Sequence, residues 1–287
     1  MPELPEVETV RRGLAPAMEG ARIDKVEVRH RGLRWPIAKD FEKRLEGQTV
    51  TSVGRRAKYL IVDVASGDVL VMHLGMSGSF RVNDGKIAQY HHEKSKSTAH
   101  DHVVFHMSNG CVLTFNDPRR FGSMKLVARS KIDEEPLLNG IGPEPLGNAF
   151  DAAMLAKAVA GKNTSLKAAL LDQRVVAGLG NIYVCEALFR AHLSPLRKAS
   201  AIANRKGQPN ERAVALVDAI KAVLHDAIKA GGSSLRDHRR ADGSLGDFQH
   251  NFLVYDREGK PCPGGKGTVK RIVQNGRSTF YCPSCQK

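Results

Sequence analysis

The sequence lacks any apolar run that approaches the roughly 20 residues needed to cross a bilayer. Its N-terminus also lacks the basic-then-apolar order of a signal peptide, so we expect a cytoplasmic protein without a membrane partner. Cysteine is scarce: there are five, an odd number that argues against a disulfide framework in a chain without an export signal. Acidic residues are also few, since 30 Asp and Glu stand against 44 Lys and Arg. The resulting net charge of +14 makes a polyanion such as a nucleic acid the leading class of partner.

The chain is long enough for two or three folded units, with 287 residues of which 41% are hydrophobic and 26% charged. Residues 22–128 contain several runs of β-branched residues with partial alternation, separated by turn signals such as Asn109-Gly110. This pattern predicts an antiparallel β-sandwich, which a polar loop over 83–100 interrupts.

A proline-rich stretch then predicts an interdomain connection over 134–149. Beyond it the apolar period becomes helical, and one apolar stripe predicts a helix over 211–230 that stops at Gly231. A glycine-rich, basic segment over 231–248 is predicted to be a mobile loop. The chain ends in a hairpin about Asn275-Gly276, so we place domains at 1–133, 150–249 and 250–287, with 134–149 as the linker.

The first residues, "MPELPEVETV", suit the start of a helix. Pro5 fits the first turn, where Glu6 and Glu8 favour the helix dipole. Val7, Val10 and Leu14 then fall on one apolar face of the predicted helix. Pro2 has a second possible use, because aminopeptidases usually remove an initiator methionine before a small residue. That cleavage would leave the secondary amine of Pro2 as the N-terminus, which is an unusual nucleophile.

The "CPSC" motif at Cys282 and Cys285 has the two-residue gap with which both thiolates can face one zinc ion. Cys262 lies at the correct distance upstream for a second pair, but the expected fourth cysteine is replaced by Gly265. The fourth ligand could be His250 or water. Alternatively, the hairpin folds without metal through the packing of its apolar residues.

Two further segments suit contacts with phosphate. In "AGLGN", a glycine-broken turn joins two predicted helices and directs backbone amides and Asn181 toward an anion. "GKNT" offers a similar anion site near Asn163. The basic hairpin at the end of the chain, with Arg277, can also bind phosphates.

Apolar residues occur on two predicted tight turns. "HLGMSGS" places Met76 between glycines, and "NDPRRFG" places Arg119 and Phe121 just beyond a strand. Each is typical of a core plug when taken alone. In a basic protein, such wedges can also enter the base stack and fill the hole left by a flipped-out base.

Six motifs, in order along essentially the whole chain, together resemble bacterial formamidopyrimidine-DNA glycosylase, also called 8-oxoguanine DNA glycosylase/AP lyase. They are "PELPEVET", "RRAKYL", "HLGMSGS", "NDPRRFG", "GLGNIY" and "GRSTFYCPSCQ". The resemblance implies an α+β multidomain fold: an N-terminal antiparallel β-sandwich with an N-terminal helix, a helix-two-turns-helix domain and a C-terminal zinc-ribbon-like β-hairpin. It also implies a bifunctional enzyme that excises oxidised purines from duplex DNA and cleaves the strand by β,δ-elimination.

In this family the N-terminal proline attacks C1′ of the damaged nucleotide. An α-amine has a reference pKa of about 7.7–8.0, against about 10.4 for lysine, so a useful fraction of Pro2 is unprotonated at neutral pH. By resemblance, Glu3 is the proton donor that assists sugar-ring opening, and Lys58 donates a proton during β-elimination. Arg277 matches the finger residue assigned to δ-elimination and phosphate binding.

The family's DNA contacts match His100, Arg119 and Asn163, and its void-filling triad matches Met76, Arg119 and Phe121. The metal ligands match Cys262, Cys282 and Cys285, so we expect one structural zinc ion, although Gly265 interrupts the set. The expected partner is double-stranded DNA with oxidised purines or abasic sites. We expect a monomer that acts on the bacterial nucleoid.

Two alternatives stay open at this point. A glycosylase of the endonuclease VIII type uses the same N-terminal proline on oxidised pyrimidines, although "PELPEVE" and both wedges favour the purine branch. The other alternative is a catalytically silent protein that binds damaged DNA. The segment "DGSLGDFQHNF" is our candidate for reading the flipped base.

Overall fold

A computed structural model of the chain describes residues 1–83, 97–233 and 246–287. These form two compact units, one from Met1–Asn139 with Ala230–Asp247 and the other from Gly140–Lys229 with Phe248–Lys287. Most of the two predicted loops, over 83–100 and 231–248, lies outside the described residues, as does the first part of the candidate lesion-reading segment. The domain boundaries predicted from the sequence stay predictions.

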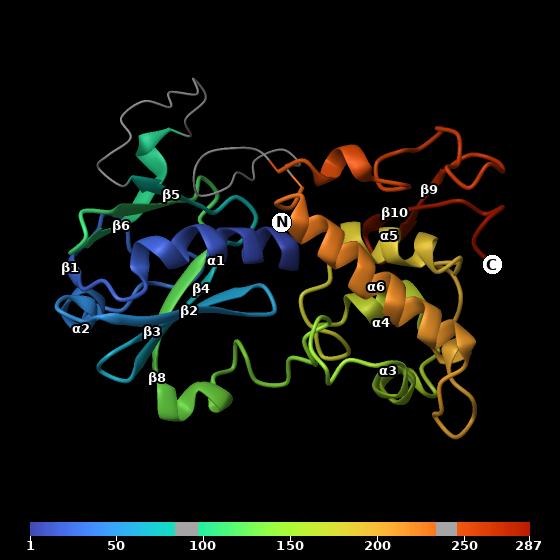
Figure 1. Cartoon of the computed structure of the whole chain (residues 1–287), viewed down its shortest axis with the longest axis horizontal. Helices are drawn as coiled ribbons and strands as arrows, with labels where there is room; N and C mark the ends of the chain where they lie inside the picture. Colours follow the sequence, from blue (N-terminus) through green and yellow to red (C-terminus); the bar gives the residue numbers. More distant parts are fainter. Residues whose placement is uncertain (84–96, 234–245) are drawn as a thin grey trace. The chain divides into compact units, whose positions relative to one another are not determined.

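Unit 1 is the predicted sandwich of two four-stranded antiparallel sheets (Figure 1). The first sheet has the order β2-β3-β4-β8, with β2 Val50–Arg56, β3 Tyr59–Val64, β4 Asp68–His73 and β8 Ser123–Ala128. The second has the order β1-β6-β7-β5, with β1 Ile23–Val28, β6 Asp101–Met107, β7 Val112–Asn116 and β5 Ser79–Asn83. Alternate residues of both sheets, such as Leu60 and Phe105, form the core between them.

Helix α1, Leu4–Met18, fixes the N-terminal segment to this sandwich. Its apolar face, with Val7, Val10 and Leu14, is buried as predicted. The helix contacts strands of both sheets, namely β2, β3 and β5. The remaining short helices of the unit are α2 Phe41–Leu45, η1 Thr98–His100 and η2 Arg129–Glu134. Because α1 packs on the core, residues 1–3 begin from a rigid support.

Unit 2 contains the helices and the C-terminal hairpin. Its helices are α3 Ala152–Val159, α4 Leu166–Leu171, α5 Asn181–Arg190 and α6 Glu211–Lys229, with two 3-10 turns, η3 Ala199–Ile202 and η4 Phe248–Asn251. The predicted stripe of α6 is buried, and α5 contacts both α6 and the hairpin. No described helix is long and apolar enough to cross a membrane.

The hairpin pairs β9, Lys270–Gln274, with β10, Arg277–Tyr281. Its turn is the predicted one, since Asn275 and Gly276 both have positive φ angles, of 50° and 71°. Cys262, Cys282, Val269 and Phe280 form a small apolar cluster beneath it with residues of α5. The hairpin is therefore packed on the helical part of its own unit.

Candidate functional site

The first residues of the chain lie at the N-terminus of α1. Glu3 is the N-cap of this helix, and Glu3 and Glu6 form a capping box in which Glu6 Oε2 accepts the Glu3 backbone N–H at 2.8 Å. Pro2 and Glu3 are buried, whereas Met1 is exposed. The predicted nucleophile and its neighbouring acid thus occupy a fixed backbone position.

Glu6 has a second role that the sequence did not reveal. Its Oε1 accepts both the backbone N–H of Ser233 at 2.8 Å and the Ser233 hydroxyl at 2.9 Å, and the carboxylate is almost fully buried. From the sequence it was interpreted only as a charge that favours the helix dipole. One side chain therefore ties the start of the chain to residue 233, which is 227 positions away.

Lys58 lies in the tight turn between β2 and β3, where Ala57 takes a φ of 52°. Lys58 is buried, since only 7% of it is exposed. Burial, together with the charges of Lys58 and Arg34, lowers the pKa of nearby His73 to about 4. His73 is therefore neutral at physiological pH, and its Nδ1 accepts the backbone N–H of Gly75 at 2.9 Å.

The two predicted wedge turns lie against each other. Gly75 has a φ of +64°, and a Cβ there would lie 2.4 Å from the carbonyl carbon of Phe121, so only glycine allows this contact. Met76 and Phe121 are each 42% exposed, and the Arg119 guanidinium lies 4.9 Å from the centre of the Phe121 ring. Met76, Arg119 and Phe121, which come from two turns far apart in the sequence, are thus brought to one place.

Asp117 holds these two turns together, and sequence reasoning missed it. Its Oδ1 accepts the Ser77 hydroxyl at 2.5 Å, and its Oδ2 accepts the Gly122 N–H at 2.8 Å. Ser77 Oγ in turn accepts the backbone N–H of Arg119 at 3.2 Å. The carboxylate is fully buried, so these bonds are protected from water. A charged residue directly after strand β7, in "NDPRR", is the signal that could have found it.

His100 lies at the end of η1, beside a row of histidines. Its ring centre is 6.4 Å from that of His102, which is 5.3 Å from that of His30. His102 Nε2 donates to the Asp117 carbonyl at 2.8 Å, and Arg120 Nη1 contacts His30 Nε2 at 2.7 Å. His100 is the partly exposed end of this row, and its carbonyl accepts the backbone N–H of Asp117 at 3.0 Å, at the start of the second wedge turn.

In unit 2, Asn181 and Lys167 support the strand that begins with Arg277. The Asn181 amide donates to the Ser278 carbonyl at 2.9 Å, and Lys167 Nζ donates to the same carbonyl at 3.1 Å and to Thr279 Oγ1 at 2.6 Å. Arg277 itself is exposed. The structure thus joins α4 and the first residue of α5 to the hairpin, whereas Asn163 lies exposed on the separate turn between α3 and α4.

A buried carboxylate also fixes the segment that leads to the cysteines. Glu186 of α5 is fully buried and accepts the backbone N–H groups of three consecutive residues at 2.8–3.0 Å, namely Leu253, Val254 and Tyr255. Burial raises the pKa of Glu186, while the three N–H donors act in the opposite direction. This contact was not foreseen from the sequence, where Glu186 lies among apolar residues.

The three cysteines of the finger form one cluster. The Sγ atoms of Cys262, Cys282 and Cys285 lie within 4.8 Å of one another, with 3.4 Å between Cys262 and Cys285. A sulfur-rich group of this size suits a zinc ion. Among the described residues the cluster gains no fourth His, Cys, Asp or Glu, so His250 is not a member.

The glycines in this loop show where a fourth side chain would point. A Cβ on Gly264 would lie 2.9 Å from Cys285 Sγ and 3.6 Å from Cys262 Sγ, whereas a Cβ on Gly265 would meet no atom within 4 Å. Gly265 also has a φ of +79°, which an L-cysteine rarely adopts. A side chain at Gly265, the position that the sequence spacing assigned to the fourth ligand, would thus start in open space.

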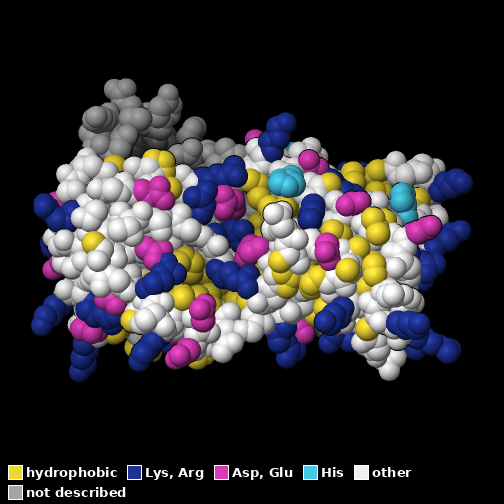
Figure 2. All heavy atoms as spheres, turned by 60° about the horizontal axis from the view of Figure 1, so that its bottom comes forward, with side chains coloured by type: hydrophobic (Ala, Val, Ile, Leu, Met, Phe, Trp, Pro, Cys, Tyr) yellow, Lys and Arg dark blue, Asp and Glu magenta, His cyan; other side chains and the backbone are white. Residues whose placement is uncertain are grey.

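Charge alone does not locate a binding surface. On the face drawn in Figure 2, Lys and Arg side chains are spread over the surface and interspersed with Asp and Glu. The wedge turns and the supported N-terminus are therefore more specific features than the net charge.

Comparison with family models matches three consecutive parts of the chain. Residues 1–124 match the formamidopyrimidine-DNA glycosylase N-terminal domain, and residues 141–239 match the formamidopyrimidine-DNA glycosylase H2TH domain. Residues 259–287 match the zinc finger found in FPG and IleRS.

Curated and solved relatives agree with these matches. The chain is 69% identical over 291 aligned residues to "Formamidopyrimidine-DNA glycosylase" of Rhodopseudomonas palustris (strain TIE-1), with all of both chains covered. It is 40% identical to the MutM (Fpg) protein of Thermus thermophilus, with a TM-score of 0.82 over 99% of this chain and 98% of that one. It is 33% identical to Lactococcus lactis Fpg in a complex with abasic-site DNA, with a TM-score of 0.84 and full coverage of both chains.

Proposed function

This chain belongs to the formamidopyrimidine-DNA glycosylase family, and we propose that it excises oxidised purines from duplex DNA with Pro2 as nucleophile. It is a DNA glycosylase with AP lyase activity, and double-stranded DNA containing oxidised purines or abasic sites is its substrate. The observation that supports the role of Pro2 most directly is its place beside Glu3, at the start of a helix that the buried Glu6 carboxylate holds.

The reaction begins once Met1 is removed. The Pro2 nitrogen attacks C1′, the bond from C1′ to the base breaks, and the base leaves with the bonding electrons and takes up a proton. Glu3 protonates the ring oxygen O4′, which opens the sugar. Because the proline nitrogen is secondary, the resulting Schiff base is an iminium cation. This cation withdraws electrons and acidifies the C2′ protons, so that loss of one of them expels the 3′ phosphate in β-elimination.

Lys58 and Arg277 serve the elimination steps. The buried ammonium group of Lys58 donates a proton during β-elimination and contacts phosphate. Arg277 binds phosphate during δ-elimination, since a guanidinium is permanently charged and suits a clamp better than an acid. Asn181 and Lys167 support this role because both bind the carbonyl of the adjacent Ser278.

The joined turns fill the space that the flipped nucleotide leaves. Met76 and Phe121 are exposed apolar side chains on a support fixed by Asp117, and Arg119 lies over the Phe121 ring. His100, Asn163 and Asn181 contact the DNA backbone. The reaction takes place in the cytoplasm, on nucleoid DNA.

The C-terminal finger holds a structural zinc ion through three thiolates. We propose that water supplies the fourth ligand, because no described His, Cys, Asp or Glu joins the three sulfurs and Gly265 has no side-chain ligand atom. In this site zinc stabilises the hairpin that presents Arg277. None of the proposed catalytic residues coordinates it.

The test is covalent trapping. The purified protein is incubated with a duplex that contains 8-oxoguanine opposite cytosine, borohydride is added, and the adduct is located by peptide mass spectrometry. An adduct on Pro2 is expected from protein that lacks Met1, and a Pro2→Gln variant, whose large second residue keeps Met1 in place, should bind abasic DNA but form no adduct. Absence of any adduct from Met1-free protein that binds the duplex would instead indicate a catalytically silent binder.

A further inference from the structure

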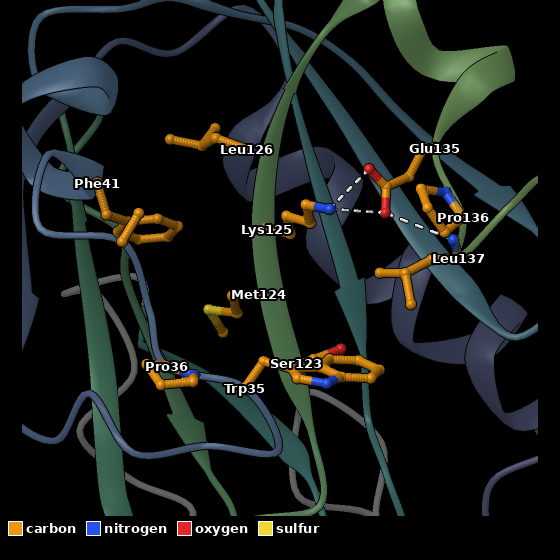
Figure 3. Close-up of a pocket in the computed structure, with 11 residues that line it drawn as sticks. Trp35, Pro36, Phe41, Ser123, Met124, Lys125, Leu126, Glu135, Pro136 and Leu137 are labelled. Carbon is orange, nitrogen blue, oxygen red and sulfur yellow. Dashed lines mark hydrogen bonds and ion pairs between the residues drawn. The ribbon is translucent and has the colours of Figure 1, made fainter.

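Strand β8 is the edge of its sheet among the described residues, and a cavity of about 460 Å³ opens along it. Figure 3 shows the arrangement: Pro36, Phe41 and Met124 lie on one side of the strand, and Glu135, Pro136 and Leu137 on the other. The lining is largely apolar, and the volume is typical of a ligand pocket. The proposed reaction makes no use of this cavity.

The hydrogen bonds at the two ends of β8 show which of its residues direct their backbone groups to β4 and which direct them outward. Arg129 N–H donates to Gly67 O across the ladder to β4, so the odd residues 123, 125 and 127 direct their backbone groups to β4. The even residues face outward, and Gly122 O accepts the N–H of Arg34 there at 2.9 Å. The backbone groups of Met124 and Leu126 then continue this outer row. No described residue pairs with them.

Arg34 thus bonds to β8 where the first residue of an added strand would bond, and the outward backbone groups of Met124 and Leu126 have no such partner among the described residues. An extended backbone placed there would bond to Met124 and Leu126 and would direct every second side chain into the cavity. An unpaired edge beside an apolar cavity is a template for strand addition.

The aromatic and charged groups at this place define the side chains that fit. Trp35 lines the cavity and is 47% exposed, and exposed Trp residues beside pockets are frequent anchors of protein interfaces. Lys125 Nζ lies 2.9 Å from both oxygens of Glu135, so these two charges neutralise each other. The Arg34 guanidinium lies 5.1 Å from the centre of the Trp35 ring and has no acidic partner among the described residues. This unpaired charge beside the Trp35 ring favours an acidic residue in the partner.

We propose that the β8 edge and its cavity bind an extended acidic segment of a partner protein by strand addition. One large apolar or aromatic side chain of that segment fills the cavity against Trp35 and Phe41. Its backbone pairs with Met124 and Leu126, and an acidic residue next to the anchor pairs with Arg34. The residues that line the cavity are not among those assigned above to catalysis and DNA binding.

The test uses a panel of fluorescein-labelled eight-residue peptides on the full-length protein. Each peptide alternates Val and Thr about one central Phe, Trp or Leu, with two acidic residues at each end, and a matched peptide has Gly at the centre. Anisotropy titrations should show saturable binding, and the peptide with Gly at its centre should bind with an affinity at least tenfold lower. In an added strand only every second backbone N–H of the peptide faces β8. N-methylation of these residues should therefore abolish binding, whereas N-methylation of the residues between them should not.

Trp35→Ala should weaken peptide binding about tenfold and leave Pro2 trapping on lesion DNA unchanged. Val214→Ala, at an exposed valine of α6, is the matched control and should bind like the wild type. The proposal is wrong if no peptide of the panel binds or if Trp35→Ala does not weaken binding. It is also wrong if the two sets of methylated peptides bind equally well. It is also wrong if lesion duplex displaces the peptide, or if Trp35→Ala weakens duplex binding equally, since the surface would then belong to DNA.

Discussion

Substitution of Asp117 should disable the wedge without touching the nucleophile. The carboxylate accepts two hydrogen bonds, from Ser77 and Gly122, and a bond to a charged group contributes about 1.5–3 kcal/mol. Asp117→Ala leaves both buried donors unpaired, so it should lower the free energy of unfolding by about 3–5 kcal/mol. Asp117→Asn keeps one acceptor and nearly the same shape, so its cost should be about 1–3 kcal/mol. The Asn variant therefore stays folded and is the one to assay.

Two substrates separate the wedge from the chemistry. On an 8-oxoguanine duplex, Asp117→Asn should reduce kcat/KM about as much as Phe121→Ala, roughly 5- to 100-fold for the loss of one stacked aromatic side chain. On a single-stranded abasic oligonucleotide there is no void to fill, so both variants should give wild-type borohydride trapping. Urea unfolding provides the stability difference. Equal losses of activity on both substrates would refute the role of Asp117 in positioning the wedge. A wild-type rate of Asp117→Asn on the duplex, when Phe121→Ala is slow, would refute it as well.

Three further perturbations test the supports of the site. Burial holds the pKa of His73 at about 4, below its ordinary 6.5. Neutral His73 therefore contributes about 3 kcal/mol to the free energy of unfolding above pH 6.5, and this contribution is lost as the pH falls to 4. The Gly75 amide shift should follow this titration in NMR spectra, and His73→Asn, which keeps an acceptor but does not titrate, should abolish it. Glu186→Ala should cost about 3–5 kcal/mol in urea unfolding, because three buried N–H groups lose their acceptor; a cost below about 1 kcal/mol would contradict this. A chelator should release zinc and broaden the amide signals of 277–281, and an unchanged hairpin spectrum would mean that apolar packing suffices.

Local patterns predicted much of the fold because they follow from short-range physics. The apolar face of α1, the stripe of α6 and the turns at Asn109-Gly110 and Asn275-Gly276 each depend on residues a few positions apart, and the sandwich follows from alternation. The matched motifs supplied the candidate catalytic and wedge residues. Zinc ligation was predicted only in part, because spacing assigns the fourth ligand to position 265, where glycine has no ligand atom, and the sequence does not show what takes its place.

The contacts missed from the sequence share one physical origin. Asp117, Glu6 and Glu186 are buried carboxylates that accept hydrogen bonds from distant segments. The donor is the Ser77 hydroxyl for Asp117, and backbone N–H groups for Glu6 and Glu186. A sequence shows that a residue is charged, but it does not show which amide will face it after folding. A charged residue directly beside an apolar strand or inside an apolar helix is the only local signal, and it does not identify the partner.

Glu6 shows why such a contact belongs at this particular place. Chain termini are usually the least ordered part of a domain, and a nucleophile at the terminus would lose the geometric precision that catalysis needs. One oxygen of Glu6 binds the backbone of Glu3, directly next to Pro2, and the other binds Ser233. Because the carboxylate is buried, both bonds act in a medium where they are stronger than in water. The backbone is thus fixed not only from Leu4, where α1 begins, but also at Glu3 and the adjoining Pro2. The N-terminal amine thereby gains the fixed position that a side-chain nucleophile obtains from its own backbone.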